Sequence, residues 1–103
     1  MFDLKQLQKM QKELSDRMER IQDELKTKTV EASAGGGIVT ATANGNQELV
    51  ALKIKPEAID EDDVEMLEDL VVAAVNLALE KAKELNQDEM SKVTGGLKLP
   101  GLF

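Results

Sequence analysis

The chain has 103 residues, contains no cysteine and no histidine, and carries a formal net charge of −7. These absences exclude thiol nucleophiles, disulfides, zinc-finger ligation and histidine-based acid–base catalysis. The length fits one small domain, and with only two aromatic residues the expected core is aliphatic and offers no platform for stacking bases.

A long amphipathic helix is predicted over residues 3–27, and Asp3 can cap its start. Apolar side chains recur three, four and seven residues apart, at Leu4, Leu7, Leu14, Met18, Ile21 and Leu25. A helix of this size is about 37 Å long, whereas the radius of gyration of such a domain is about 13 Å. Part of the helix should therefore project, or pack against another chain.

Three strands should follow this helix. Apolar and polar side chains alternate in residues 27–34, and β-branched residues are frequent in 38–43. A third alternating segment covers 48–55, and Pro56 ends it. The glycines at 35–37 and the sequence Asn44-Gly45-Asn46 are turn signals between the strands, so the sheet is predicted to be an antiparallel meander.

A second long helix is predicted over residues 62–92, with Asp60 or Asp62 as its cap. Its segment from Met66 to Leu79 is apolar nearly all round, which is typical of a helix buried on more than one side. One side should cover the sheet, and the other favours a dimer. Residues 93–103 are expected to form a flexible, apolar tail. The predicted fold class is α+β, with the element order α–β–β–β–α.

The sequence holds no convincing catalytic or metal site. Glu57 to Asp69 contains eight acids and no base, but it lacks the spacing and central glycine of a calcium loop, so capping and solvation explain it better. Gly35–Gly37 matches no phosphate-binding motif, and the serines have no histidine to activate them. We therefore expect no cofactor, no metal and no enzymatic activity.

Lysines and arginines of the two predicted helices are the main candidate functional residues. Lys5, Lys9 and Lys12 are three or four residues apart, so they share one face of the first helix. Considered without any relative, these cations are better explained as the solvated, salt-bridged exterior of a coiled coil. The net charge of −7 also argues against a phosphate-binding surface.

A resemblance to known proteins runs essentially from end to end of the chain. Its most specific stretch is EMLEDLVVAAVN at residues 65–76. The others are MQKEL at 10–14, GGIVTATANG at 36–45, IKP at 54–56, MSKVTGGL at 90–97 and LPG at 99–101. In their order and spacing these stretches resemble the YbaB/EbfC family of small bacterial nucleoid-associated proteins.

The resemblance implies a cytoplasmic, nucleoid-associated homodimer of α–β–β–β–α protomers, shaped like a pair of tweezers. Its projecting helices would bind double-stranded DNA with little or broad sequence preference, and so affect nucleoid organisation and gene expression. We expect no small-molecule substrate. We also expect no membrane partner, because the longest apolar stretch, Leu70–Leu79, is too short to span a bilayer.

The DNA contacts proposed for the family lie on the projecting helices. The cations at matching positions here are Lys5, Lys9, Lys12, Arg17, Arg20, Lys81, Lys83 and Lys92. Acids are interspersed among them, so binding should depend strongly on salt concentration. The alternative hypothesis, supported by the net charge, is an acidic module that docks another protein and associates with DNA only indirectly.

Overall fold

The computed structural model of the chain describes residues 3–95, with side chains described for residues 3–92. The elements are α1 (Leu4–Thr27), β1 (Thr29–Ala34), β2 (Val39–Asn44), β3 (Leu49–Ile54), the short 3₁₀ helix η1 (Pro56–Ala58) and α2 (Val64–Gly95). The predicted order of two helices around three strands is confirmed. Each strand differs from its predicted range by no more than about two residues, the usual uncertainty of element ends.

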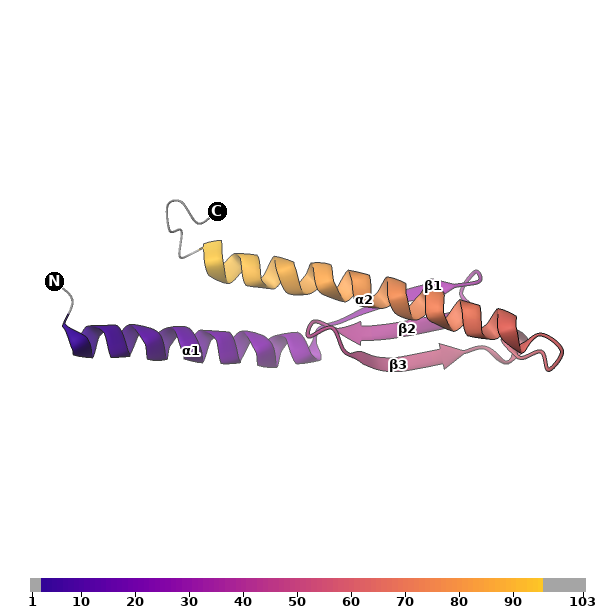
Figure 1. Cartoon of the computed structure of the whole chain (residues 1–103), viewed down its shortest axis with the longest axis horizontal. Helices are drawn as coiled ribbons and strands as arrows, with labels where there is room; N and C mark the ends of the chain where they lie inside the picture. Colours follow the sequence, from indigo (N-terminus) through magenta and orange to yellow (C-terminus); the bar gives the residue numbers. More distant parts are fainter. Residues whose placement is uncertain (1–2, 96–103) are drawn as a thin grey trace.

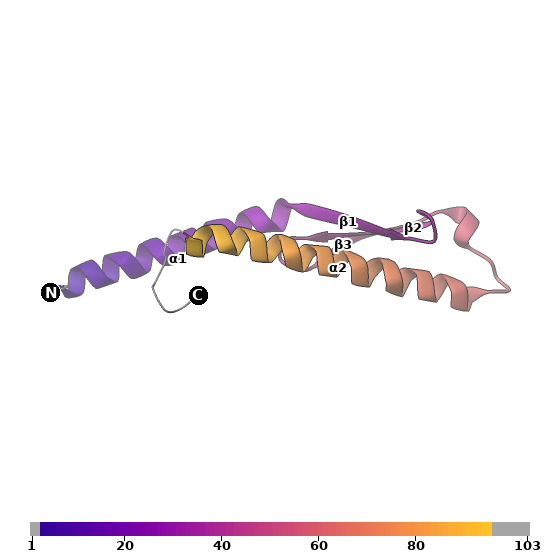
Figure 2. The same ribbon diagram turned by 90° about the horizontal axis from the view of Figure 1, so that it is seen from above.

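α1 projects from the sheet as an arm, and α2 runs back over the sheet until its last turns lie beside the C-terminal half of α1 (Figures 1 and 2). The molecule measures 72 × 25 × 16 Å, with a radius of gyration of 19.9 Å. A compact domain of this size has a radius of gyration of about 13 Å. The expectation that part of the first helix projects is therefore confirmed.

Asp3 sets the start of α1, because its Oδ1 accepts a hydrogen bond from the backbone N–H of Lys5 at 2.7 Å. The apolar face of α1 is exposed at its large side chains from Leu4 to Met18. At the base of the arm Ile21 is half-buried and Leu25 is fully buried. Only the last two turns of α1 are thus anchored, and a segment about 22 Å long extends beyond them.

The sheet is an antiparallel meander with the order β1-β2-β3, as predicted. Gly35, Gly36 and Gly37 all have positive φ angles in the first turn, which favours glycine there. The predicted hairpin between the second and third strands is confirmed, and its left-handed residue is Gln47, with φ 62°, not Gly45. The buried Asn44 side chain shapes this turn, since its Oδ1 accepts hydrogen bonds from the backbone of Asn46 and Glu48.

The core lies between α2 and the central strand. A row of small side chains on α2, Ala74, Ala78 and Ala82, is fully buried. It packs against Ala32 of β1 and against Val39, Ala41 and Ala43 of β2. Side chains this small let the helix approach the sheet closely. The prediction that the apolar segment of the second helix covers one face of the sheet is confirmed.

The ends of α2 correct two predictions. Its cap is Asp63, and neither Asp60 nor Asp62, because the Asp63 Oδ1 accepts a hydrogen bond from the backbone N–H of Met66 at 3.2 Å. Asp60 instead shapes the preceding turn by accepting from the backbone of Asp62. At the other end the helix continues to Gly95, through residues 93–95 that were assigned to the tail. Residues 96–103 of the predicted tail lie outside the described residues.

Candidate nucleic-acid interface

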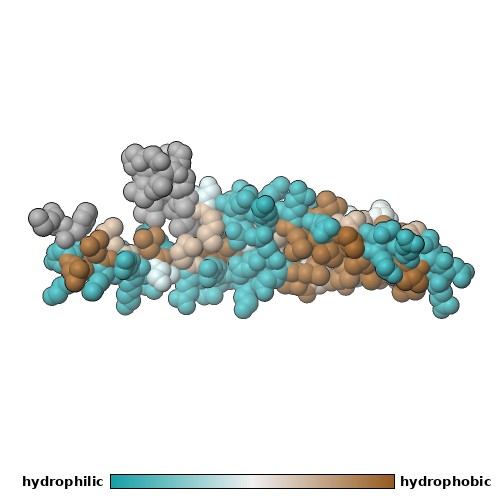
Figure 3. All heavy atoms as spheres, viewed as in Figure 1, coloured by the Kyte–Doolittle hydropathy of each residue, from teal (hydrophilic) through white to brown (hydrophobic). Residues whose placement is uncertain are grey.

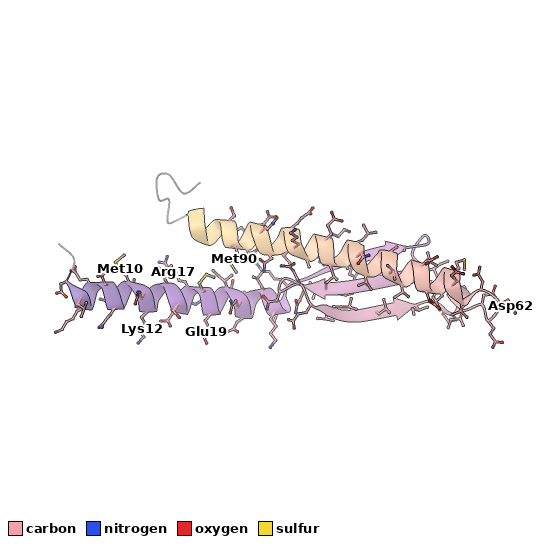
Figure 4. All side chains as sticks on the ribbon, viewed as in Figure 1. Met10, Lys12, Arg17, Glu19, Asp62 and Met90 are labelled. Carbon is pink, nitrogen blue, oxygen red and sulfur yellow. The ribbon has the colours of Figure 1, made fainter. Side chains whose placement is uncertain are left out.

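The far end of the arm is the most cationic part of the described chain. Residues 4–12, which we call the lysine tip, contain three lysines and no acid. Lys5, Lys9 and Lys12 are exposed and share one face of α1. Lys12 points away from α2, on the opposite side of α1 from Met10 (Figure 4). The lysine face thus lies opposite the apolar face and spans about 10 Å, roughly three nucleotide steps of a DNA strand.

The rest of α1 is not positive. Residues 13–27 carry five acids and three bases, so their net charge is −2. Arg17 points to the α2 side of the helix, away from Lys12, whereas Glu19 lies on the same side as Lys12 (Figure 4). Arg17 is therefore on another face from the lysines of the tip. The positive potential of the arm is concentrated at its distal end.

The three predicted cations of α2 lie apart from the lysine tip. Lys81 is over the sheet, where its Nζ donates a hydrogen bond to the backbone carbonyl of Glu31 at 3.0 Å. Lys92 pairs with Glu89 at 3.4 Å, one turn earlier in the helix. Lys83 is exposed. The eight predicted cations thus do not form one continuous surface within a single copy of the chain.

The acids gather at the other end of the molecule. Residues 57–69, which we call the acidic end, hold eight acids and no base around the turn that leads into α2. This turn is farthest from the N-terminus of α1, as the label of Asp62 marks in Figure 4. The molecule is 72 Å long, several times the Debye length of about 8 Å at physiological ionic strength. The eight acids of the acidic end therefore do not oppose phosphate binding at the lysine tip.

Two further lysines, absent from the predicted set, line a hollow on the sheet. Lys53 and Lys55 line it together with Glu31, Gly37 and Thr40. The available signal in the sequence was their spacing of two residues, which puts both side chains on one face of a strand. The carboxylate of Glu31 shares this hollow, so the surface is mixed in charge and less suited to phosphate than the lysine tip.

An ion pair ties the base of the arm to α2. The Lys28 Nζ lies 2.9 Å from the Glu89 Oε1. This hydrogen bond raises the pKa of Lys28 above its ordinary 10.5, with a smaller Coulombic contribution from Glu24. The same bond lowers the pKa of Glu89 below its ordinary 4.5, and Lys92 adds to the effect. Lys28 therefore holds two elements together, which leaves it less available to a phosphate.

The edge of the sheet at β3 has little cover from α2. Asn86 marks the side of α2 that faces the β2–β3 turn, because its amide donates a hydrogen bond to the carbonyl of Gly45. Val72 lies on the same side of α2, because it precedes Asn86 by about four helical turns. Apolar side chains on this side are 41–58% exposed: Leu49, Val50 and Leu52 of β3, and Val72 of α2. We call these four the apolar edge. Figure 3 shows apolar atoms gathered over the sheet and the first half of α2.

Residues 1–97 match the YbaB/EbfC DNA-binding family. The chain belongs to this family. One relative is the nucleoid-associated protein Teth39_2199 of Thermoanaerobacter pseudethanolicus, which is 57% identical over 97% of this chain and 86% of that protein. A nucleoid-associated protein of Acetivibrio thermocellus is 59% identical over the same shares. The resemblance found in the sequence is confirmed.

The fold is also similar to that of a solved structure, the uncharacterized protein HP0035 from Helicobacter pylori. The TM-score is 0.79, and the match covers 91% of this chain and 99% of that one, at 21% sequence identity. At this identity the likeness supports the fold alone. The α–β–β–β–α architecture of this YbaB/EbfC family member thus recurs in a solved structure of low sequence identity.

Membership of the YbaB/EbfC family makes the chain a nucleoid-associated, DNA-binding protein. The family is one of DNA-binding proteins and not of enzymes. No helix in the described part of the chain is long and apolar enough to cross a membrane. Within the same residues, no three acidic side chains are grouped so that they could hold a metal ion.

Proposed function

We propose that this family member binds double-stranded DNA as a homodimer, with the lysine tips of its two arms in contact with phosphates. The observation that carries this proposal is the position of Lys5, Lys9 and Lys12: they lie on one exposed face at the end of a projecting helix, in a segment, residues 4–12, that itself contains no acid. Cations on a projecting helix can reach the backbone of a duplex without bringing the acidic end near it. Such contacts supply affinity that falls steeply with salt.

Little or broad sequence preference follows from the side chains available. Lysine contacts to phosphate position a protein on DNA but carry no sequence information. The described residues contain no aromatic side chain on which an unpaired base could stack, which favours a duplex over a single strand. Arg17, Arg20, Lys83 and Lys92 remain proposed as further contacts. Lys81 is retained as well, although a contact would compete with its bond to Glu31.

A second copy of the chain is the proposed cover for the apolar edge. An edge strand with exposed Leu49, Val50 and Leu52 is a ready site for association. Pairing there would leave both arms projecting from one central body, as in a pair of tweezers. Two lysine tips on one molecule would then bind one duplex with a higher effective affinity than either alone.

We place the protein in the cytoplasm, on the nucleoid, where non-specific DNA binding would affect nucleoid organisation and gene expression. The support for this location is the name of its relatives, which are nucleoid-associated proteins. The competing proposal is an acidic module that docks another protein and meets DNA only indirectly. The acidic end, with its eight acids and no base, is the feature that favours it.

The test is DNA binding by purified protein across a salt series, with variants that neutralise three lysines each. Replacing Lys5, Lys9 and Lys12 with glutamine should weaken binding equally on duplexes of different sequence. It should reduce the slope of log affinity against log salt by about 2.7 for each arm in contact. The matched control neutralises three exposed lysines elsewhere, Lys26, Lys53 and Lys55, and should change the slope little.

Two outcomes would contradict the proposal. Equal losses of DNA affinity in both triple variants would mean that binding depends on the overall charge and that the lysine tip does not contact phosphates in preference to other lysines. Failure of the wild-type protein to bind duplex DNA at about 50 mM salt, where phosphate contacts are strong, would favour the acidic interaction module.

A further inference from the structure

The backbone of Gly45 joins the two long helices. Its N–H lies 2.8 Å from the carbonyl oxygen of Leu25 and 2.9 Å from that of Lys28, at the end of α1. Its own carbonyl accepts a hydrogen bond from the Asn86 Nδ2 of α2 at 2.8 Å. One residue of the β2–β3 turn is therefore bonded to the base of the arm on one side and to α2 on the other.

The packing around Gly45 leaves no room for a side chain at this position. A Cβ at this position would lie 2.5 Å from the Leu25 Cδ2 and 3.0 Å from the Leu25 backbone oxygen. Leu25 is itself fully buried. A second bond from the same turn reaches α1, where the Asn46 Nδ2 donates to the carbonyl oxygen of Gln22 at 3.2 Å. The turn thus lies directly against the last two turns of the arm.

The direction of the arm depends on this small contact area. Within the lysine tip, Lys5 lies about 30 Å and Lys12 about 20 Å from Leu25 along the helix. A rotation of about 10° at the base would displace Lys5 by roughly 5 Å and Lys12 by roughly 3.4 Å, as much as or more than the rise of about 3.4 Å between nucleotides of one strand. Movement at the base would therefore take the tip lysines out of register with phosphates.

We infer that Gly45 and Asn86 are positioning residues: together they hold α1 at a fixed direction to the sheet, and so place the lysine tip for DNA. The DNA part of this inference rests on the function proposed above. Neither residue is proposed to touch DNA. Asn86 acts through Gly45, and Gly45 acts through the end of α1.

The direction of the arm can be measured without DNA. The chain has no cysteine, so spin labels on Ser15→Cys in α1 and Ser33→Cys in β1 are specific. Diluting labelled protein with excess unlabelled protein leaves one labelled copy in any assembly, and the measured distance is then within one chain. Asn86→Ala should broaden the distribution of this distance. The matched control is Asn76→Ala, the same exchange at an exposed position of α2.

DNA binding by the same variants, without labels, provides the second readout. Asn86→Ala should weaken binding by about fivefold, the effect of one lost hydrogen bond. The salt slope should stay unchanged, because every lysine is retained and the bound arm returns to its wild-type direction, at the free-energy cost that weakens binding. Asn76→Ala should bind as the wild type does. A purely structural role for Asn86 would lower the melting temperature but change neither the distance nor the affinity at a temperature where the variant is fully folded.

The inference is overturned if the distance distribution of folded Asn86→Ala equals that of Asn76→Ala, or if it broadens while DNA affinity is unchanged. If Asn86→Ala does not fold, Asn46→Ala removes only the bond to Gln22 and should give a smaller broadening. If Asn46→Ala does not broaden the distance distribution, the inference is equally contradicted. If the wild type binds no DNA, the proposed function fails, while the distance measurement still decides whether these residues hold the arm.

Discussion

Lys28 and Glu89 lie 61 positions apart in the sequence, yet the Lys28 Nζ and the Glu89 Oε1 are 2.9 Å apart in the folded chain. Lys28 follows the last residue of α1, and Glu89 lies in the last third of α2. The pair thus links the base of the arm to the helix that covers the sheet.

This pair should make stability depend on pH at both extremes. Glu89 has a lowered pKa in the folded state, so its contribution is present above about pH 4.5 and is lost as the pH falls below that value. Lys28 has a raised pKa, so its contribution is present below about pH 10.5 and is lost as the pH rises above it. The free energy of unfolding of Glu89→Gln should therefore differ from that of the wild type between these limits, and converge with it outside them.

The control for the pH prediction is Glu80→Gln, which makes the same charge change at an exposed position of α2. Urea unfolding of all three proteins at several pH values is the measurement. A difference between Glu89→Gln and the wild type that stays constant as the pH falls to about 2, well below the ordinary pKa of a glutamate carboxyl, would show that the ion pair is not its source.

Leu25→Ala should destabilise the protein by about 2–5 kcal/mol, because it removes a fully buried side chain and leaves a cavity at the base of the arm. Leu4→Ala makes the same exchange on the same face of α1, where the side chain is 72% exposed. It should change the free energy of unfolding by no more than about 0.5 kcal/mol. Equal effects of the two variants in urea unfolding would mean that the arm is covered along its whole length.

Ala78→Leu should destabilise the protein by about 1–3 kcal/mol or more, because Ala78 is fully buried where α2 crosses β2 and a larger side chain must push them apart. Ala73→Leu makes the same exchange on the exposed side of the same helix and should be nearly neutral. Thermal unfolding of both variants is the measurement. A neutral Ala78→Leu would contradict the close approach of helix and sheet.

Leu52→Glu should shift the proposed homodimer toward monomer, because it places a charge in the apolar edge that the second copy is expected to bury. Leu7→Glu is the matched variant on the arm, and the two leucines are similarly exposed, at 41% and 46%. Sedimentation of both across a concentration series measures the assembly. If Leu7→Glu dissociates the dimer and Leu52→Glu does not, the interface lies on the apolar face of α1 and not at the apolar edge.

Several features were determined by the sequence alone, because they depend on neighbours close along the chain. Periods of 3.6 and 2 residues predicted both helices and all three strands, and the short turns predicted an antiparallel meander. The spacing of Lys5, Lys9 and Lys12 was enough to put them on one helical face. The family could also be identified from the sequence, since its stretches follow one another in order from end to end.

Local signals failed where several candidates of one kind compete or where distant segments meet. Asp60, Asp62 and Asp63 all suit a helix cap, and only the folded backbone selects Asp63. The sequence marks Gly45 as part of a turn, but only the fold shows that a residue without a Cβ is needed there for its close contact with Leu25, 20 residues earlier.

The tertiary structure alone decided which cations of the predicted set are drawn into the fold. Lys81 bonds to β1 and Lys92 pairs with Glu89, whereas the lysine tip remains exposed. It also decided that the acidic end lies at the far end of a 72 Å molecule. The physical reason is that electrostatics depends on distance in space. Composition yields only a total charge of −7, while the fold separates that charge into an acidic end and a positive tip.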